Sequence, residues 1–461
     1  MIKYILLLLF TFKSFGEEIR QLDLRRSLIL AENAIKKNYY LASLPFIKEA
    51  MVITKGPNEK LDEVIDRVLE VVGLAQFRFL PEDVLINSNS LFSKVVLAKK
   101  FIDTKKINDA KDIITDINDS HYIASLAYQI RGTIQMLTSE FESARSSYKQ
   151  CVTVAQKRKK QYKKSDTRYE YFEFIESTCD ISIARAYYKE GKLIEALNEY
   201  SKVDMRSYLF PSSLLESAWT LYRLEDYQTS IGRTIAFRAP FLKDYFYPET
   251  EQLIAMSFFK ICHWDEVKDT LKYFDDKHYN NARALIKFLD KNTLKEAKVL
   301  QTILDRKNFF KSFKVTDLIF NRIRNTPSFI YHSNLLHLGV KELKRIRAMK
   351  GKDPLVGLYY NNAKRELRIK STYLGYQIKA KLYKVANEFI KASQVLSLLG
   401  IEVHGYKRDK LANRKPYEVS EVDDLPIVRT ASNVNWDFTG EFWSDEIGSY
   451  VWSKESRCPK Q

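Results

Sequence analysis

Residues 181–200 read ISIARAYYKEGKLIEALNEY, with Ala184 and Ala196 twelve positions apart on either side of Gly191. Each alanine lies within a stretch of helical pattern. A pair of small residues at this offset indicates two antiparallel helices that cross closely, because only small side chains let the backbones approach. The stretch therefore predicts a helix–turn–helix unit.

The same offset recurs along the chain. The small residue of the first helix and its partner in the second helix are Ala31/Ser43, Ala98/Ala110, Gly132/Ala144, Ala184/Ala196, Ala218/Ser230 and Ala255/Val267. Successive first members lie 67, 34, 52, 34 and 37 residues apart, which gives a period near 34 with one double interval and one insertion. With only 14 Gly and 11 Pro in 461 residues, the composition also favours an all-α fold. We expect an α-solenoid.

The best-patterned unit resembles a tetratricopeptide repeat through Ala184, Tyr187, Gly191, Leu193 and Ala196. Residues 127–148 and 217–231 are similar, and residues 255–267 less so. The resemblance implies a right-handed α-solenoid over residues 24–275. Its units are expected near 24–57, 58–85 (degenerate), 91–121, 125–170, 171–207, 211–242 and 248–275.

The insertion separates the third and fourth clear units and is expected to lengthen the two helices that flank it. It carries the basic hairpin tip, residues 157–164, which is either a solvated face or a contact with an anionic envelope surface. Cys151 and Cys179 lie on either side of a turn near residue 165. They could face each other and form a disulfide, or Cys151 could fill a small packing position as a thiol.

The N-terminus reads MIKYILLLLFTFKSFG, in which Lys3 precedes a nine-residue apolar run and Ser14 and Gly16 are small. This pattern is typical of a secretory signal peptide over residues 1–16. The apolar run is too short for a transmembrane helix, which needs about 20 residues, so we expect no membrane span after processing. The chain would then be exported, in a Gram-negative bacterium to the periplasm.

Lys and Arg exceed Asp and Glu by 17. This excess favours an acidic partner, although an AT-rich genome would also give many lysines. Export argues against nucleic acid, so we expect a protein or peptide partner that is acidic.

In tetratricopeptide arrays, the first helix of each pair lines the concave groove. Carried onto this chain, the family register implies that aromatic and basic residues of the last three units line the groove. The candidate groove-binding residues are Arg185, Tyr188, Lys189, Trp219, Tyr222, Arg223, Met256, Phe259 and Lys260. Such a set suits an acidic peptide with aromatic anchors, although each ring could instead pack between adjacent helices.

Residues 276–412 remain helical in pattern, and a stripe from Ile378 to Leu399 repeats at four- and three-residue steps. This stripe favours one packed face of a long helix. Residues 413–461 form an acidic, aromatic tail. We expect it to dock on the helical body through a clasp of Trp436, Phe438, Phe442 and Trp443.

The six histidines have no metal-ligand spacing, and the chain lacks a phosphate loop or a nucleophile elbow. We therefore expect no enzyme activity, no cofactor and no metal. The leading hypothesis is a protein–protein interaction scaffold of the cell envelope. The alternative is an accessory protein of peptidoglycan or polysaccharide metabolism that binds glycan.

Overall fold

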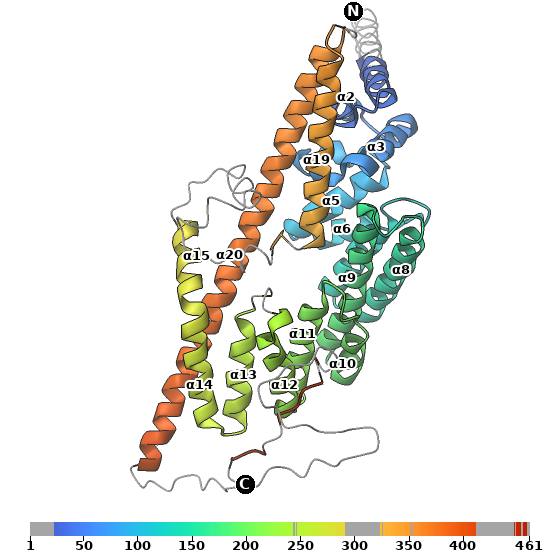
Figure 1. Ribbon diagram of the computed structural model, residues 1–461. Coiled ribbons are helices and arrows are strands. Elements are labelled where there is room, and N and C mark those ends of the chain that lie inside the picture. Colours follow the sequence, from blue (N-terminus) through green and yellow to red (C-terminus); the bar gives the residue numbers. More distant parts are fainter. Residues whose placement is uncertain are drawn as a thin grey trace, which may run out of the picture. The chain divides into compact units, whose positions relative to one another are not determined.

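The computed structural model describes residues 23–242, 245, 247–290, 323–324, 326–351, 354–411, 447, 449–452 and 455–458. Every regular element within these ranges is helical (Figure 1). The expected signal peptide, residues 1–16, lies outside the described residues. The chain divides into two compact units, and both units combine segments that are far apart in the sequence.

Unit 1 contains residues 1–179 and 327–374. Residues 23–36 form its first described helix. The elements that follow are α2 (Tyr40–Ile53), α3 (Glu59–Val72), η1 (Leu74–Phe79), α4 (Glu82–Leu85), α5 (Leu91–Asp103), α6 (Ile107–Ile113), α7 (Ala124–Leu137), α8 (Phe141–Lys159), the first part of α9 (Thr167–Glu190), α19 (Pro327–Ala348) and the first part of α20 (Val356–Leu411).

Unit 2 contains residues 180–326 and 375–461. Its elements are the end of α9, α10 (Leu193–Ser201), α11 (Phe210–Arg223), α12 (Tyr227–Ile235), η2 (Ala236–Arg238), η3 (Pro240–Leu242), α13 (Glu249–Lys260), α14 (Trp264–Phe274), η4 (Asp275–Tyr279), α15 (Asn280–Asp290) and the second part of α20. The sequence placed the end of the array at residue 275, whereas the packing assigns parts of residues 276–412 to both units.

The turns between paired helices share one backbone geometry. Seven positions after the first small residue of every pair, the chain has a positive φ. These residues are Asn38 (57°), Lys105 (61°), Ser139 (63°), Gly191 (91°), Glu225 (65°) and Cys262 (60°). Only one of the six is glycine, although glycine adopts this region at least cost. The helix-pair register predicted from small residues is therefore present in all six pairs.

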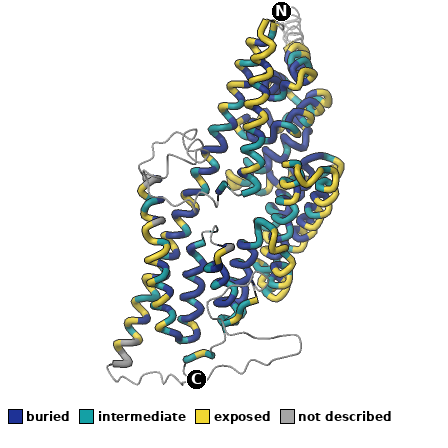
Figure 2. The backbone as a smooth tube through the Cα atoms, in the orientation of Figure 1, coloured by how far each residue is buried: buried dark blue, intermediate teal, exposed yellow. Residues whose placement is uncertain are grey.

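Hydrogen bonds repeat with the same register. In each pair the residue after the positive-φ position donates its N–H to the carbonyl five residues earlier, as Lys192 does to Tyr187 at 3.0 Å. This bond satisfies a carbonyl at the end of the first helix. All twelve small-residue positions are buried, and Ser230 Oγ donates to Ala218 O at 2.9 Å. Figure 2 shows buried residues concentrated where successive helices face each other.

The core of unit 1 joins the N-terminal repeats to α19 and the first part of α20. Glu342 of α19 is buried, and its carboxylate accepts hydrogen bonds from Leu41 N (3.1 Å) and Ala42 N (3.0 Å). Helix α2 has no side-chain cap from its own flanking residue, so Glu342 satisfies two of its free N–H groups. Glu366 of α20 pairs with Lys48 at 2.6 Å. The C-terminal helices are thus part of the N-terminal core.

Helices α8 and α9 have 19 and 24 residues and form the long hairpin expected from the insertion. Cys151 and Cys179 are joined by a disulfide across it, and both are fully buried. At the turn, the Asp166 carboxylate accepts from Arg168 N at 2.9 Å. Hydrogen bonds from the Arg168 side chain lower the pKa of Asp166.

Helix α20 has 56 residues and continues past Gly400 and Gly405. The predicted stripe is buried from Ile378 to Leu396. Within unit 2, Phe389 stacks on Phe274 with ring centroids 5.0 Å apart. The stripe is therefore one packed face of a long helix.

Candidate functional site

Three first helices of unit 2 each present an aromatic residue followed by a basic residue. We name these six residues the aromatic–basic face. They are Tyr188 and Lys189 on α9, Tyr222 and Arg223 on α11, and Phe259 and Lys260 on α13. In each helix the ring is half-buried and the cation is exposed. The repeat register places them at equivalent positions, because each ring lies four residues after the small residue at the helix crossing.

Tyr188 and Arg223 connect neighbouring repeats. The Arg223 guanidinium lies 4.7 Å from the centroid of the Tyr188 ring, and Nη1 donates to Tyr188 O at 3.4 Å. The Tyr188 ring also packs against the buried cluster around Ala184 and Ala196. The Tyr188 ring thus contributes to packing within the protein. The exposed Arg223 guanidinium retains N–H donors for a ligand carboxylate.

Arg185 has an intramolecular partner that the sequence did not suggest. Its guanidinium makes a bidentate pair with Glu216 of α11, at 2.8 Å and 2.6 Å. Tyr200 donates its hydroxyl to the same carboxylate at 3.0 Å. Burial, followed by the charge of Glu216, raises the pKa of Tyr200. Arg185 therefore orders the edge of the face and contributes little free charge.

Trp219 and Tyr222 both lie on α11, the middle one of the three helices. Their rings meet edge to face at 5.8 Å, and Tyr222 also contacts Tyr227 at 5.3 Å. Both residues pack against the buried cluster of α11 and α13. The Trp219 Nε1 is buried and has no hydrogen-bond partner among the described residues. A buried indole N–H normally has an acceptor, and none of the described residues provides one here.

At α13, the Phe259 ring contacts Trp264 at 5.0 Å and Tyr406 of α20 at 6.2 Å. Trp264 and Tyr406 stack with centroids 4.7 Å apart. Met256 accepts a weak hydrogen bond from Gln252 at 3.6 Å. Trp264 is recognisable at the start of its helix, but Tyr406 lies about 140 residues away and no local pattern points to it.

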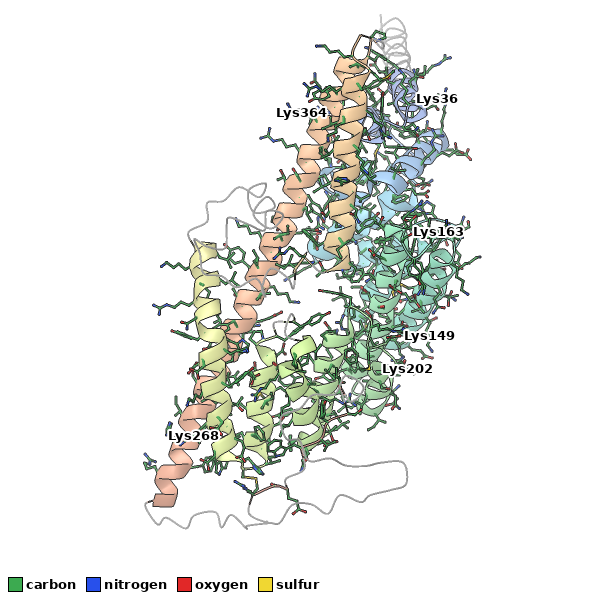
Figure 3. The ribbon with its side chains drawn as sticks, in the orientation of Figure 1. Lys36, Lys149, Lys163, Lys202, Lys268 and Lys364 are labelled. Atoms are coloured by element: carbon green, nitrogen blue, oxygen red, sulfur yellow. A yellow bond between two sulfur atoms is a disulfide. The ribbon has the colours of Figure 1, made fainter. Side chains whose placement is uncertain are left out.

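Positive charge by itself does not mark this face. The lysines labelled in Figure 3 come from both units and extend away from the ribbon. They belong to the first described helix, α8, the α8–α9 turn, the end of α10, α14 and α20: Lys36, Lys149, Lys163, Lys202, Lys268 and Lys364. What distinguishes the aromatic–basic face is the repeated pairing of a half-buried ring with an exposed cation.

The basic hairpin tip, residues 157–164, is partly used within unit 1. Lys159 bonds to Glu176 and lies 5.7 Å from the centroid of the Tyr169 ring. Arg158 donates to Ser120 O. Lys157, Lys160, Lys163 and Lys164 are exposed.

The proposed tail clasp, Trp436, Phe438, Phe442 and Trp443, lies outside the described residues. Residues nearer the C-terminus do dock on unit 2, at α11 to α14. There Cys262 and Cys458 are joined by a disulfide, for which the sequence offered no geometric argument.

No helix in the described ranges is long and apolar enough to cross a membrane. Among the residues that the structure describes, no three His, Cys, Asp or Glu are grouped so that they could hold a metal ion.

No protein-family model matches the chain, and no curated protein matches it. Among solved structures, the crystal structure of the apo form of RapI is similar, with 11% sequence identity and a TM-score of 0.33. The match covers 75% of this chain and 97% of that chain. Similarity at this level gives no information about function.

Proposed function

We propose that the chain is a non-enzymatic interaction scaffold of the cell envelope, and that its aromatic–basic face binds an acidic segment of a partner protein. The observation that carries the proposal is the threefold repetition of a half-buried ring beside an exposed cation on α9, α11 and α13. Rings supply apolar contact area, and cations supply charge-assisted hydrogen bonds to carboxylates. Because the repeats have nearly the same period, their equivalent residues would contact a bound segment at regular intervals along its length.

The resemblance to tetratricopeptide repeats supports this proposal, because these arrays bind peptides with their first helices. The same resemblance is the basis for expecting a right-handed solenoid. The signal-like sequence at residues 1–16 supports export to a periplasm. The two disulfides are compatible with it, because an oxidising compartment maintains such bonds.

The glycan alternative relied on the tryptophans of the tail. The Trp452 ring packs edge to face against Phe258 at 5.1 Å. Trp452 is thus used in a contact within the protein, whereas Trp436 and Trp443 lie outside the described residues.

The test is a selection of random peptides on the immobilised full chain, with a glycan array as a second arm. We expect the selected peptides to be enriched in Asp and Glu with spaced aromatic residues. Reversal of Lys189, Arg223 and Lys260 to Glu should weaken the selected peptide by at least tenfold, or about 1.4 kcal/mol, because three exposed ion contacts become repulsive.

The matched control reverses Lys149, Lys163 and Lys202 to Glu, which changes the net charge equally at exposed positions outside the first helices. It should leave affinity within about twofold. Equal loss in both triple variants would show that only net charge matters and would contradict the proposed site. Specific glycan binding without peptide selection would favour the alternative function.

A further inference from the structure

The C-terminal segment, residues 447–458, reads IGSYVWSKESRC. Its described residues, 447, 449–452 and 455–458, lie against helices of unit 2. Its described part is drawn in dark red beside α12 in Figure 1. Main-chain hydrogen bonds hold it at two places: Trp452 N donates to Gln228 O at 3.1 Å, and Arg457 N donates to Ile261 O at 2.9 Å. Both acceptors lie on the helices or turns of the last two repeats.

Side chains anchor the segment at its start and near its middle. Ile447 is buried in the cluster that includes Leu214, Leu215 and Leu253. Trp452 packs on Phe258 of α13. Main-chain bonds combined with pockets for alternate side chains are the usual means of binding an extended peptide.

Gly232 of α12 permits this contact. A Cβ at this position would lie 1.9 Å from Tyr450 O, and a backbone atom cannot yield as a flexible side chain would. Glycine is otherwise unfavourable within a helix by up to about 1 kcal/mol relative to alanine. The residue therefore fits a surface where another backbone approaches closely.

His263 connects the C-terminal segment to the turn between α13 and α14. Its Nε2 lies 2.8 Å from Glu455 O and its Nδ1 lies 3.1 Å from Glu266 Oε1, in a fully buried position. The hydrogen bond with His263, aided by the charges of His263 and Arg457, lowers the pKa of Glu266 to about 2. This network adds a polar contact next to the disulfide.

The two disulfides differ in accessibility. Cys151 and Cys179 are fully buried, whereas Cys262 and Cys458 are both partly exposed. Cys262 occupies the positive-φ turn position of the last repeat, where the other repeats have Asn, Lys, Ser, Gly and Glu. Exchange with an external thiol requires access to the sulfur, so we expect a reductant to open the Cys262–Cys458 bond before the fully buried Cys151–Cys179 bond.

We propose that the surface of α11 to α14 under residues 447–458 is a docking site for extended segments with aliphatic and aromatic anchors, and that the Cys262–Cys458 bond latches the chain's own segment there. When the latch opens, a partner segment of the same chemistry takes the site. This surface adjoins the aromatic–basic face, because Tyr222 packs against the same buried cluster as Ile447. The inference rests on the docked segment and does not depend on the proposed function of that face.

Opening the latch is an ordinary thiol–disulfide exchange with a protein or small-molecule dithiol. A thiolate of the dithiol attacks one sulfur and forms a mixed disulfide, and its second thiolate then displaces the protein sulfur. The dithiol leaves as a disulfide, while Cys262 and Cys458 gain two electrons and two protons as thiols.

The first experiment uses the full chain under limiting dithiothreitol, with alkylation and mass spectrometry to locate free thiols. We expect Cys262 and Cys458 to become labelled while Cys151 and Cys179 remain paired. Hydrogen exchange of the Trp452 and Arg457 amides should accelerate by at least about tenfold on reduction. Unchanged exchange at both amides in the reduced chain would show a permanent structural element and would overturn the latch.

The second experiment measures binding of a fluorescein-labelled peptide of residues 447–457, which lacks Cys458. The host is the full chain with Cys458→Ser and Trp452→Ala, which removes the latch and weakens the tethered competitor but leaves the surface intact. We expect measurable binding to this variant and none to the oxidised wild type, because the tethered segment has a millimolar effective concentration.

Gly232→Ala in the same background should abolish peptide binding, since its Cβ would clash with the docked backbone. The matched control is Gly405→Ala, a helical glycine with open space around it, and it should bind as the host does. Circular dichroism verifies that each variant is folded. Absence of binding to a folded host, or retained binding after Gly232→Ala, would overturn the docking site.

Discussion

At the scale of single residues, the repeat depends on one backbone angle. Six turn positions have a positive φ, and five of them are occupied by residues with a Cβ. For an L-residue this conformation costs roughly 1–2 kcal/mol, so the surrounding helix pair must stabilise it. The packing of the two helices at their crossing, where the small residues of both helices are buried, provides that stabilisation.

Replacement of Ser139 or Glu225 by Gly should raise the free energy of unfolding by roughly 0.5–1 kcal/mol, because glycine adopts the left-handed region without a Cβ penalty. Gly191→Ala should lower it by about 1 kcal/mol for the opposite reason. A Cβ at position 191 would meet nothing within 4 Å, so the decrease in unfolding free energy measures the cost of the backbone angle alone. Urea denaturation with constant m-values measures these changes. Equal effects of Gly191→Ala and Gly56→Ala, where φ is ordinary, would contradict the explanation.

Lys370 predicts a pH dependence. Burial lowers its pKa to about 7, and its Nζ donates to Val72 O at the end of α3. Above this pH the unfolded chain binds a proton that the folded chain lacks, so stability should rise with pH from about 7 to 10. The slope should approach about 1.4 kcal/mol per pH unit for this one group.

Comparison of Lys370→Met with Lys364→Met, an exposed lysine of the same helix, tests this assignment. Denaturation curves should lose the rise in stability between about pH 7 and 8 only in Lys370→Met. Burial also lowers the pKa of Lys99 to about 8, so that lysine adds a slope at higher pH in both variants. A rise retained in the lower range in Lys370→Met would mean that another group is responsible.

At the scale of helices, the close crossings at small residues explain why the helices pair and why added side-chain volume at a crossing destabilises the fold. Gly132 of α7 faces Tyr148 of α8, and a Cβ at Gly132 would lie 2.6 Å from the ring. The aromatic residue thus fills the space that the missing side chain leaves. Close packing of this kind tolerates little added volume.

Gly132→Ala should lower the free energy of unfolding by about 1–3 kcal/mol through overpacking. Gly405→Ala in α20 should instead raise it by up to about 1 kcal/mol, because helix propensity improves in open space. Thermal unfolding distinguishes the two directions. In a double-mutant cycle, Tyr148→Ala should remove most of the penalty of Gly132→Ala; additivity would show that the two sites are independent.

At the scale of the whole molecule, unit 1 depends on contacts between residues that are about 300 positions apart in the sequence. Glu342 caps α2 from about 300 residues away, and Glu366 neutralises Lys48 in a nearly buried pair. Loss of these partners would leave buried N–H groups and a buried charge unsatisfied, which is costly.

Truncation after residue 326 should therefore unfold unit 1, whereas truncation after residue 411 should leave it folded. Hydrogen exchange at Leu41 and Ala42 and binding of a hydrophobic dye measure the result. The first truncation should lose protection and bind dye, and the second should do neither. Intact protection at these amides without α19 and α20 would show that the N-terminal repeats fold alone.

The sequence by itself determined the helix-pair register. Two small residues twelve positions apart mark where two helices cross, and this crossing is local because only a short turn connects the helices. The sequence also indicated the equivalent positions of Tyr188, Tyr222 and Phe259 and the long α8–α9 hairpin. It could not show that Glu216 engages Arg185, that Tyr406 covers Trp264, or that Cys458 pairs with Cys262. These contacts join residues separated by 31 to 196 positions and have no periodic signature. Only the tertiary structure decided them, because such pairings depend on how complete helices pack and on how the chain returns to them.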